Sequence, residues 1–117
     1  MLQFQEYQDV AVIDLKGDVG PQEVEKVGKT LFSLLRKRRS KVVLNFQQVD
    51  HVHYPSIRPL IEVVSKLKRL RADLKFAGMS SYTQSIFEFV GAQEFVESFE
   101  SVPKAVLSFR SDWRTWH

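Results

Sequence analysis

Two histidines have the side chains best suited to binding a metal ion in this sequence of 117 residues. His51 and His53 are two positions apart, so on an extended segment their side chains face the same way and could chelate a metal ion. No cysteine accompanies them, and Asp50 would point to the opposite face. The sequence therefore predicts packing or surface histidines and no metal site.

Sequence patterns typical of catalysis are missing from the chain. It has no glycine-rich phosphate loop, no serine in a nucleophile elbow and no His-Glu metal motif. The fold could bring Asp14, Asp18 and Asp50 together, but carboxylates near turns are more often caps and solubilising charges. We expect a protein that is not an enzyme and that needs no cofactor.

Charge is segregated along the chain, although the net charge is only +3. Residues 36–75 hold eleven basic and three acidic side chains, a net charge of +8, whereas the remainder carries −5. A basic region of this kind attracts nucleic acid or an anionic membrane surface, or simply solvates a helix end and compensates its dipole. The candidate anion-binding residues, called the basic pole below, are Arg36, Lys37, Arg38, Arg39, Lys41, Lys68, Arg69 and Arg71.

Hydrophobic periodicity predicts the elements that position these residues. Alternation over residues 2–5 and the β-branched run 10–15, which we expect Gly17 to close, indicate a hairpin. Apolar spacings of three and four predict one helix from Pro21 and a second from Ile57, with Ser56 as its N-cap. Residues 42–46 and 74–77 are typical of buried strands.

The last third of the chain predicts two shorter helices and an edge strand. A third helix follows Ser80 or Ser81 and ends at Gly91, with an apolar face of Tyr82, Ile86, Phe89 and Val90. Phe95, Val96 and Phe99 suggest an edge strand, and Pro103 opens a final helix with Val106, Leu107 and Phe109. The order β-β-α-β-α-β-α-(β)-α indicates an α/β sheet with crossover helices.

Length and composition suit one domain in a reducing compartment. The chain is 44% hydrophobic and 26% charged, and it contains no cysteine. No apolar run approaches the roughly 20 residues of a spanning helix. The first residues have neither the basic nor the apolar region of a secretory signal. We expect a cytoplasmic protein.

Several short motifs occur in a characteristic order and spacing. They are Leu-Lys-Gly-Asp at residues 15–18, the strand 42–46 with Val49, Phe-Val-Gly-Ala at 89–92, and Ser-Val-Pro-Lys-Ala at 101–105. Together they resemble the STAS family, small domains typified by bacterial anti-sigma-factor antagonists. The resemblance covers about residues 5–109, and implies a single STAS-like domain over 1–109 and a tail over 110–117.

This resemblance carries expectations of fold and function. It implies a four- to five-stranded mixed sheet with crossover helices, and a protein–protein interaction module of bacterial signalling. The implied partner is a regulatory protein, an anti-sigma factor of the kinase type. Other STAS proteins are subunits of multi-component machines such as lipid transporters, and that role stays open.

The turn before the second helix departs from the family pattern. Phosphorylation switches of the family usually carry Asp-Ser-Ser/Thr-Gly there, and those positions fall on His53, Tyr54, Pro55 and Ser56. Pro55 replaces the phosphoacceptor and has neither a hydroxyl nor an N–H group. Signalling by partner switching would then not use the usual phosphosite, and Ser56, one residue further on, is the remaining candidate by proximity alone.

The same turn has the features of a binding site. Pro55 and Pro59, the latter expected at position N3 of the second helix, stiffen the start of the helix. Tyr54 offers a large amphipathic contact and Arg58 a charged one, and both residue types are favoured at interface hot spots. The predicted partner-binding residues are His53, Tyr54, Pro55, Ser56, Ile57 and Arg58.

Two alternatives remain at other parts of the chain. The predicted topology brings the basic pole, with Lys66, to the end opposite the Tyr54 turn, where it could bind RNA, DNA or anionic lipid. Trp113 and Trp116 of the tail could pack on the domain, or anchor a partner or a homodimer.

Overall fold

A five-stranded mixed sheet forms the centre of the molecule. The computed structural model describes residues 2–7 and 9–111. β1 (Leu2–Tyr7) pairs antiparallel with β2 (Val10–Val19), and β3 (Lys41–Val52), β4 (Asp73–Ala77) and β5 (Ser98–Phe99) follow in parallel. The spatial order is β1-β2-β3-β4-β5. The predicted α/β fold with a mixed sheet is confirmed.

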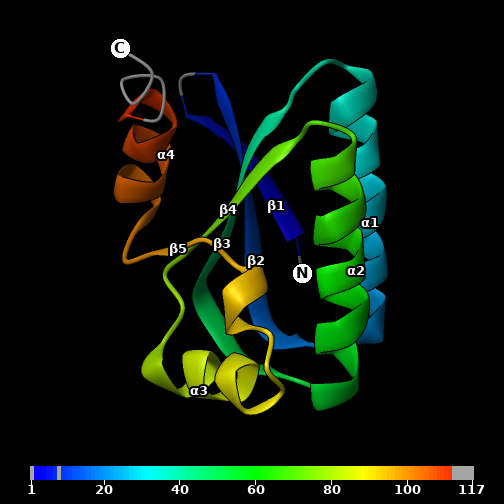
Figure 1. Ribbon diagram of the computed structural model, residues 1–117, viewed down its shortest axis with the longest axis vertical. Coiled ribbons are helices and arrows are strands. Elements are labelled where there is room, and N and C mark those ends of the chain that lie inside the picture. The colour runs from blue at the N-terminus through cyan, green and yellow to red at the C-terminus, as the bar shows by residue number, and fades with distance from the viewer. Residues whose placement is uncertain (1, 8, 112–117) are drawn as a thin grey trace.

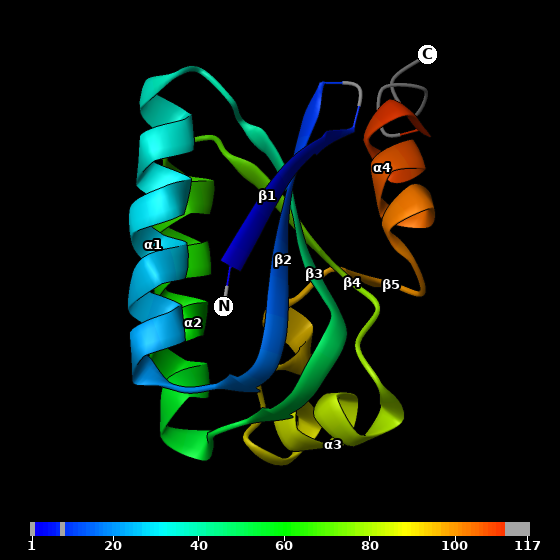
Figure 2. The same ribbon diagram turned by 180° about the vertical axis from the view of Figure 1, so that it is seen from behind.

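Helices cover both faces of this sheet. α1 (Pro21–Arg36) and α2 (Tyr54–Arg69) lie side by side on one face, and α4 (Val102–Ser111) lies on the other (Figures 1 and 2). α3 (Ser81–Phe89) lies at one end of the sheet, near the start of α2, and the 3-10 helix η1 (Gln93–Phe95) follows it. One end of the molecule thus gathers the start of α2 and the whole of α3.

Strand alternation divides the core between the two faces. Leu44, Phe46 and Phe76 point towards α1 and α2, whereas Val43 and Ala77 point towards α4. The Phe46 and Phe76 rings stack with centroids 5.2 Å apart. Phe87 of α3 meets both rings edge-on, at 6.3 Å and 6.2 Å. This aromatic trio anchors α3 to the sheet and sets which side of α3 is exposed.

Two strands run further than the sequence predicted. Gly17 does not close β2, because the strand continues to Val19 through register shifts against β3. The glycine has a φ of 72° next to one of these shifts, a conformation that favours glycine over other residues. β3 likewise continues past Phe46 to Val52, so it delivers the chain to the start of α2 without a loop.

The predicted start of α2 is wrong by several residues. The N-cap is His53, not Ser56, and Tyr54 is the first helical residue. Ser56 lies one turn before Leu60, on the face that packs against the sheet, and so it is buried rather than capping. Pro59 consequently lies beyond the first turn, at the sixth helical position rather than the third. Tyr54 precedes Pro55, and a residue before proline prefers an extended backbone. Burial of the helix face that contains Ser56 outweighed this preference.

The predicted apolar face of α3 is also wrong in part. Ser80 is the N-cap, and the Thr83 backbone N–H donates to its hydroxyl at 3.0 Å. The buried face consists of Thr83, Ile86 and Phe87, whereas Tyr82, Phe89 and Val90 are exposed. Gly91 follows the C-cap with a φ of 73°, as expected.

The edge strand and the last helix need smaller corrections. Phe95 belongs to η1, and β5 contains Ser98 and Phe99 only. On α4 the buried apolar residues are Ala105, Val106 and Phe109, whereas Leu107 is exposed. The helix extends to Ser111, two residues into the segment predicted as a tail. Trp113 and Trp116 lie outside the described residues.

A lysine lies in the smaller part of the core, beneath α4. Lys75 is fully buried on β4, with its Nζ 4.6 Å from the ring centroid of Phe109 and 5.4 Å from that of Phe99. Its Nζ also lies 3.4 Å from the Glu97 carboxylate. The ammonium group therefore connects β4 to both β5 and α4.

Candidate protein-binding surface

The six predicted partner-binding residues lie at the end of the molecule where α2 begins and α3 lies (Figure 1). Four of them are exposed: His53, Tyr54, Pro55 and Arg58. The other two, Ser56 and Ile57, are buried against the sheet. The exposed group can contact a partner directly, and the buried pair holds that group in position.

Tyr54 forms an aromatic pair with a residue that the sequence placed in the core. Its ring lies 5.4 Å from that of Phe89, centroid to centroid, at an interplanar angle of 51°. Tyr54 is 50% exposed and Phe89 77% exposed. Large apolar side chains this exposed, and in mutual contact, are typical of interaction sites.

A groove begins beside this pair, between α2 and the chain that follows α3. One wall is Tyr54, Ile57, Arg58, Ile61 and Glu62 of α2. The other wall is the segment 90–95, whose lining residues are Val90, Gly91, Ala92 and Phe95. We call this the α2–α3 groove. Its second wall was missed by sequence reasoning because Val90 and Phe95 were interpreted as core or strand residues.

The two histidines lie on the neighbouring part of this end. Their ring centroids are 5.3 Å apart, so they do share one side of the chain. His51 Nδ1 lies 2.7 Å from the hydroxyl of Tyr82, and the two rings are stacked with centroids 5.7 Å apart. In the described residues no three histidine, cysteine, aspartate or glutamate side chains gather as metal ligands would.

The start of α2 offers few donors to an anion. Pro55, at the second helical position, has no N–H group, and the N–H of Ser56 donates to the His53 carbonyl at 2.8 Å. The hydroxyl of Ser56 is buried and has no hydrogen-bond partner among the described residues. The exposed groups here are Tyr54 and Pro55 together with the imidazole of His53 and the guanidinium of Arg58.

The basic pole lies at the opposite end, where α1 and α2 both terminate (Figures 1 and 2). Two of its residues are engaged with the β1–β2 hairpin. Arg39 pairs with Glu6, and Lys41 Nζ lies 3.0 Å from the Asp9 carboxylate. The hydrogen bond from Lys41 lowers the pKa of Asp9 below its usual value. Part of the positive charge is therefore neutralised within the protein.

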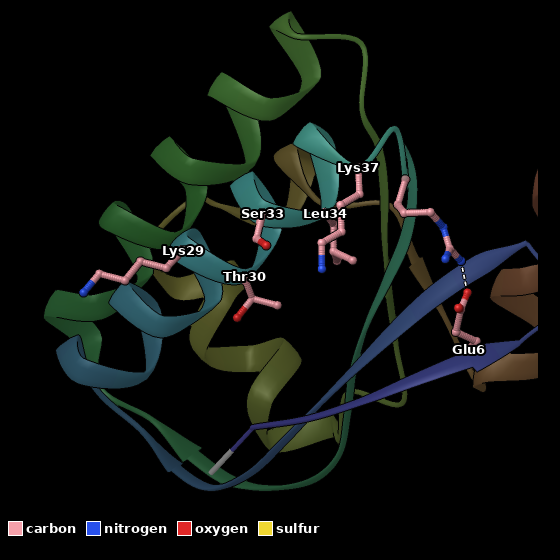
Figure 3. Close-up of a pocket in the computed structure, with 7 residues that line it drawn as sticks. Glu6, Lys29, Thr30, Ser33, Leu34 and Lys37 are labelled. Carbon is pink, nitrogen blue, oxygen red and sulfur yellow. Dashed lines mark hydrogen bonds and ion pairs between the residues drawn. The ribbon is translucent and has the colours of Figure 1, made fainter.

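A shallow hollow lies between α1 and β1 next to the basic pole. Figure 3 shows Thr30 and Ser33 on α1, Lys37 just after its last residue, and Glu6 on β1, with a dashed line marking the ion pair of Glu6. Lys29 also lines this hollow, although its Nζ lies 3.2 Å from the Glu25 carboxylate. The lining thus mixes cations with hydroxyl groups and one carboxylate.

The three aspartates considered for catalysis do not form a carboxylate cluster in the described chain. Asp14 Oδ1 accepts a hydrogen bond of 2.9 Å from the Asn45 side chain. Asp18 lies opposite His51 in the strand register, and Asp50 is exposed on β3. Asp14 therefore contributes to the β2–β3 pairing.

Sequence comparison gives the family of this fold. The model described as STAS domain matches residues 1–105, nearly the whole chain. The chain belongs to the STAS domain family. The resemblance predicted from the short motifs is thereby confirmed. No curated protein sequence matches the chain.

Solved structures show that the fold is shared with STAS regulators at low sequence identity. An anti-sigma factor antagonist from Mycobacterium paratuberculosis has a TM-score of 0.79 at 11% identity, with 94% of this chain and 93% of that chain covered. A variant of RsbS from Moorella thermoacetica has a TM-score of 0.79 at 14% identity, with 97% of both chains covered. The Bacillus cell fate determinant SpoIIAA, in its phosphorylated form, has a TM-score of 0.68 at 14% identity, with 93% and 99% covered.

The helices of this STAS domain are short and amphipathic. Among the described residues, none of them is long and apolar enough to cross a membrane. α1 and α2 each have 16 residues and bury one stripe against the sheet.

Proposed function

We propose that this STAS domain is a non-catalytic module that binds a regulatory protein, in the manner of an anti-sigma-factor antagonist in bacterial signalling. The observation that carries the proposal is the exposed Tyr54–Phe89 pair at the start of α2. Ser56 and Ile57, two and three residues further along α2, are buried and hold the start of this helix against the sheet. A rigid aromatic anchor of this kind costs little conformational entropy on binding.

In our proposal, this binding is not regulated by phosphorylation at the position that is usual in the family. Pro55 occupies that position and has no hydroxyl. Ser56 is 1% exposed, so a kinase would have no access to its hydroxyl in this conformation. A phosphate on Ser56 would also place about two negative charges against the sheet, at a large desolvation cost.

The partner implied by the family is an anti-sigma factor of the kinase type, in the cytoplasm. The neighbours in structure include an anti-sigma factor antagonist, which supports a protein partner of this regulatory class. A STAS subunit of a multi-component transporter would use a protein-binding surface as well. The identity of the bound protein distinguishes the two roles.

Affinity purification from the native cell tests the proposal. The full chain carries a tag, and the baits are the wild type, Tyr54→Ala and Arg58→Ala. Leu70→Ala is the matched control, because Leu70 is exposed at the other end of α2. We expect the same regulatory protein with the wild type and the control, and at least about tenfold less with the two site variants. Equal recovery by all baits would show that the surface is wrongly assigned.

Anion binding by the basic pole is the second candidate function. The hollow with Lys29 and Lys37 beside hydroxyl groups favours it (Figure 3). The test is binding of DNA, RNA and anionic vesicles at two salt concentrations, with Arg38→Glu combined with Arg69→Glu as the variant. Binding that is strong at low salt and lost in the variant would support this function over the first.

A further inference from the structure

Two arginines of the basic pole adopt a backbone conformation that favours glycine. Arg38 follows the C-cap of α1 with a φ of 64°, and Arg71 follows the C-cap of α2 with a φ of 69°. In the part of the chain that the structure describes, every other residue with a positive φ is a glycine. Glycine is common directly after a helix because a Cβ atom is strained in this conformation.

α1 and α2 end in the same hydrogen-bonded turn. After α1, the N–H groups of Arg38 and Arg39 each donate at 2.9 Å to carbonyls of the last helical turn. After α2, the N–H groups of Arg71 and Ala72 donate in the same pattern at 3.0 Å. Glycine would form either turn with less strain, so the fold does not account for an arginine at both places. A role of the two side chains outside the fold does account for them.

Most of the positive charge of the basic pole has no acidic partner within the protein. Arg39 and Lys41 form ion pairs with the β1–β2 hairpin. The other six residues of the pole are exposed, and among the described residues no ion pair involves them: Arg36, Lys37, Arg38, Lys68, Arg69 and Arg71. Asp73 lies at this end too, and the ends of α1 and α2 each add about half a negative charge. Six cations outweigh these negative charges, so the pole attracts anions.

One large apolar side chain is exposed among these cations. Leu70, the C-cap of α2, is 49% exposed and lies between Arg69 and Arg71 in the chain. An anionic lipid surface suits both kinds of side chain, because its phosphates attract the cations and its acyl chains accept the leucine.

The basic pole lacks the features with which proteins hold single-stranded nucleic acids. Such proteins stack the bases on exposed aromatic rings. The exposed aromatic side chains of the described residues belong to the start of α2, to α3 or to the segment after it: Tyr54, Tyr82, Phe89 and Phe95. A cationic surface with an exposed leucine and no exposed aromatic ring favours lipid over nucleic acid.

We propose that the basic pole binds the surface of an anionic membrane, with Leu70 inserted among the lipid headgroups. This inference rests on the second candidate function, anion binding, and specifies the anion as lipid. Arg38 and Arg71, held just beyond the ends of α1 and α2, contact lipid phosphates on either side of the pole.

Membrane binding by the basic pole leaves the predicted partner-binding residues accessible. α1 and α2 run along the longest dimension of the molecule, whose principal extents are 39 × 27 × 24 Å (Figures 1 and 2). When the ends of these helices face the lipid, Tyr54 at the start of α2 lies at the far end of the molecule. The domain can then hold a regulatory protein at the membrane without competition between the two sites.

Binding of the full chain to four probes tests the proposal. The probes are vesicles of phosphatidylcholine, the same vesicles with about one third phosphatidylglycerol, a DNA duplex and a single-stranded RNA. Co-sedimentation measures vesicle binding and fluorescence anisotropy measures nucleic-acid binding, each at two salt concentrations. We expect binding to the anionic vesicles that weakens with salt, weaker binding to both nucleic acids, and none to the neutral vesicles.

Replacement of both strained arginines by glycine separates binding from folding. Arg38→Gly with Arg71→Gly relieves two strained conformations and removes two cations from a positively charged surface. The double variant should unfold at a higher temperature than the wild type. It should also bind the anionic vesicles at least about tenfold more weakly, since each cation near such a surface contributes about fivefold.

The matched control removes two charges elsewhere. Lys16→Gln with Lys26→Gln changes exposed residues of β2 and α1 that lie outside the basic pole. Vesicle binding by this variant should stay within about twofold of the wild type.

Leu70→Ser tests the apolar contact. It should weaken binding to the anionic vesicles at least about threefold. Binding to the nucleic acids and purification of a regulatory protein through Tyr54 should not change. Thermal unfolding verifies that the variant remains folded.

The outcomes distinguish this proposal from the function on which it rests. Tighter binding to DNA or RNA than to the anionic vesicles would overturn the proposal and keep anion binding, whereas no binding to any anionic probe would refute both. Equal binding to neutral and anionic vesicles, or vesicle binding unaffected by Leu70→Ser, would also overturn it. A double glycine variant that unfolds at a lower temperature would assign both arginines to the fold and remove the argument from strain.

Discussion

Phe87 and Phe89 are two residues apart on α3, and their exposed fractions are 1% and 77%. Phe87 is inserted against the stacked rings of Phe46 and Phe76 in the core. Phe89 lies on another side of the helix and contacts Tyr54. The same residue type therefore serves the fold in one case and the candidate binding surface in the other.

Alanine at these two positions should have very different effects on stability. Phe87→Ala removes a buried ring from the aromatic trio and should lower the free energy of unfolding by about 3–5 kcal/mol. Phe89→Ala should change it by less than about 0.5 kcal/mol, because the side chain is exposed. Urea denaturation of both variants measures the difference. Similar losses would show that α3 packs with a different face.

Substitution of Ser56 tests the burial that argues against its phosphorylation. Ser56→Ala removes a buried hydroxyl without a partner and should raise the free energy of unfolding by about 0.5–1 kcal/mol. Ser56→Asp buries an unpaired carboxylate and should cost at least about 3 kcal/mol. Both values follow from chemical denaturation. An aspartate variant as stable as the wild type would return Ser56 to the list of candidate phosphosites.

Two substitutions of Lys75 distinguish the contribution of its buried charge to stability from that of its packing. Lys75→Met keeps an unbranched chain among Phe99, Phe109 and α4, and removes the desolvation cost of the ammonium group. We expect the free energy of unfolding to change by less than about 1 kcal/mol. Lys75→Ala leaves a cavity and should cost about 2–4 kcal/mol. Equal losses in urea titrations would instead assign the stabilisation to the ammonium contacts.

Acid should remove one stabilising contact at the start of α1. The Gly20 backbone N–H donates to Glu23 Oε1 at 2.9 Å, which lowers the pKa of that carboxyl below its usual value near 4.5. The folded-state pKa is the lower one, so this stabilisation is complete at pH 7 and is lost as the pH falls from about 5 through the folded-state value.

Glu23→Ala should accordingly lower the free energy of unfolding by about 0.5–1.5 kcal/mol at pH 7. The difference from the wild type should shrink at pH 3. Glu25→Ala is the matched control, because Glu25 forms an exposed pair with Lys29 and does not contact Gly20. A difference that stays constant with pH would contradict the role of the ionised carboxylate.

Much of the fold could be predicted because the apolar spacing within most elements has one dominant period. Val24, Val27 and Leu31 of α1, for example, form a single stripe, and all three are buried. The element order and the mixed sheet followed from such stripes and from the family motifs. Boundaries were harder: β2 passes through Gly17, and α2 begins at Tyr54. Both depend on pairing and burial that involve distant residues.

Only the α2 side of the candidate surface could be predicted from the sequence. Tyr54 and Arg58 could be chosen from their residue types beside a proline, and both are exposed. Phe89, Val90 and Phe95 could not, because an aromatic or aliphatic residue in a short helix is usually a core residue. The signal that could have found them is the competing stripe of Thr83, Ile86 and Phe87, which fits α3 equally well.

The sequence by itself determined the family, the order of elements, the proline at position 55 in the turn before α2 and the separation of charge into a basic middle and acidic flanks. These are properties of residue type and spacing, which do not need a partner in space. Only the tertiary structure decided that Ser56 is buried, that Phe89 is exposed and that an apolar groove lies between α2 and the segment after α3. Such facts depend on which face of each helix meets the sheet, and that choice is made by contacts between residues far apart in the chain.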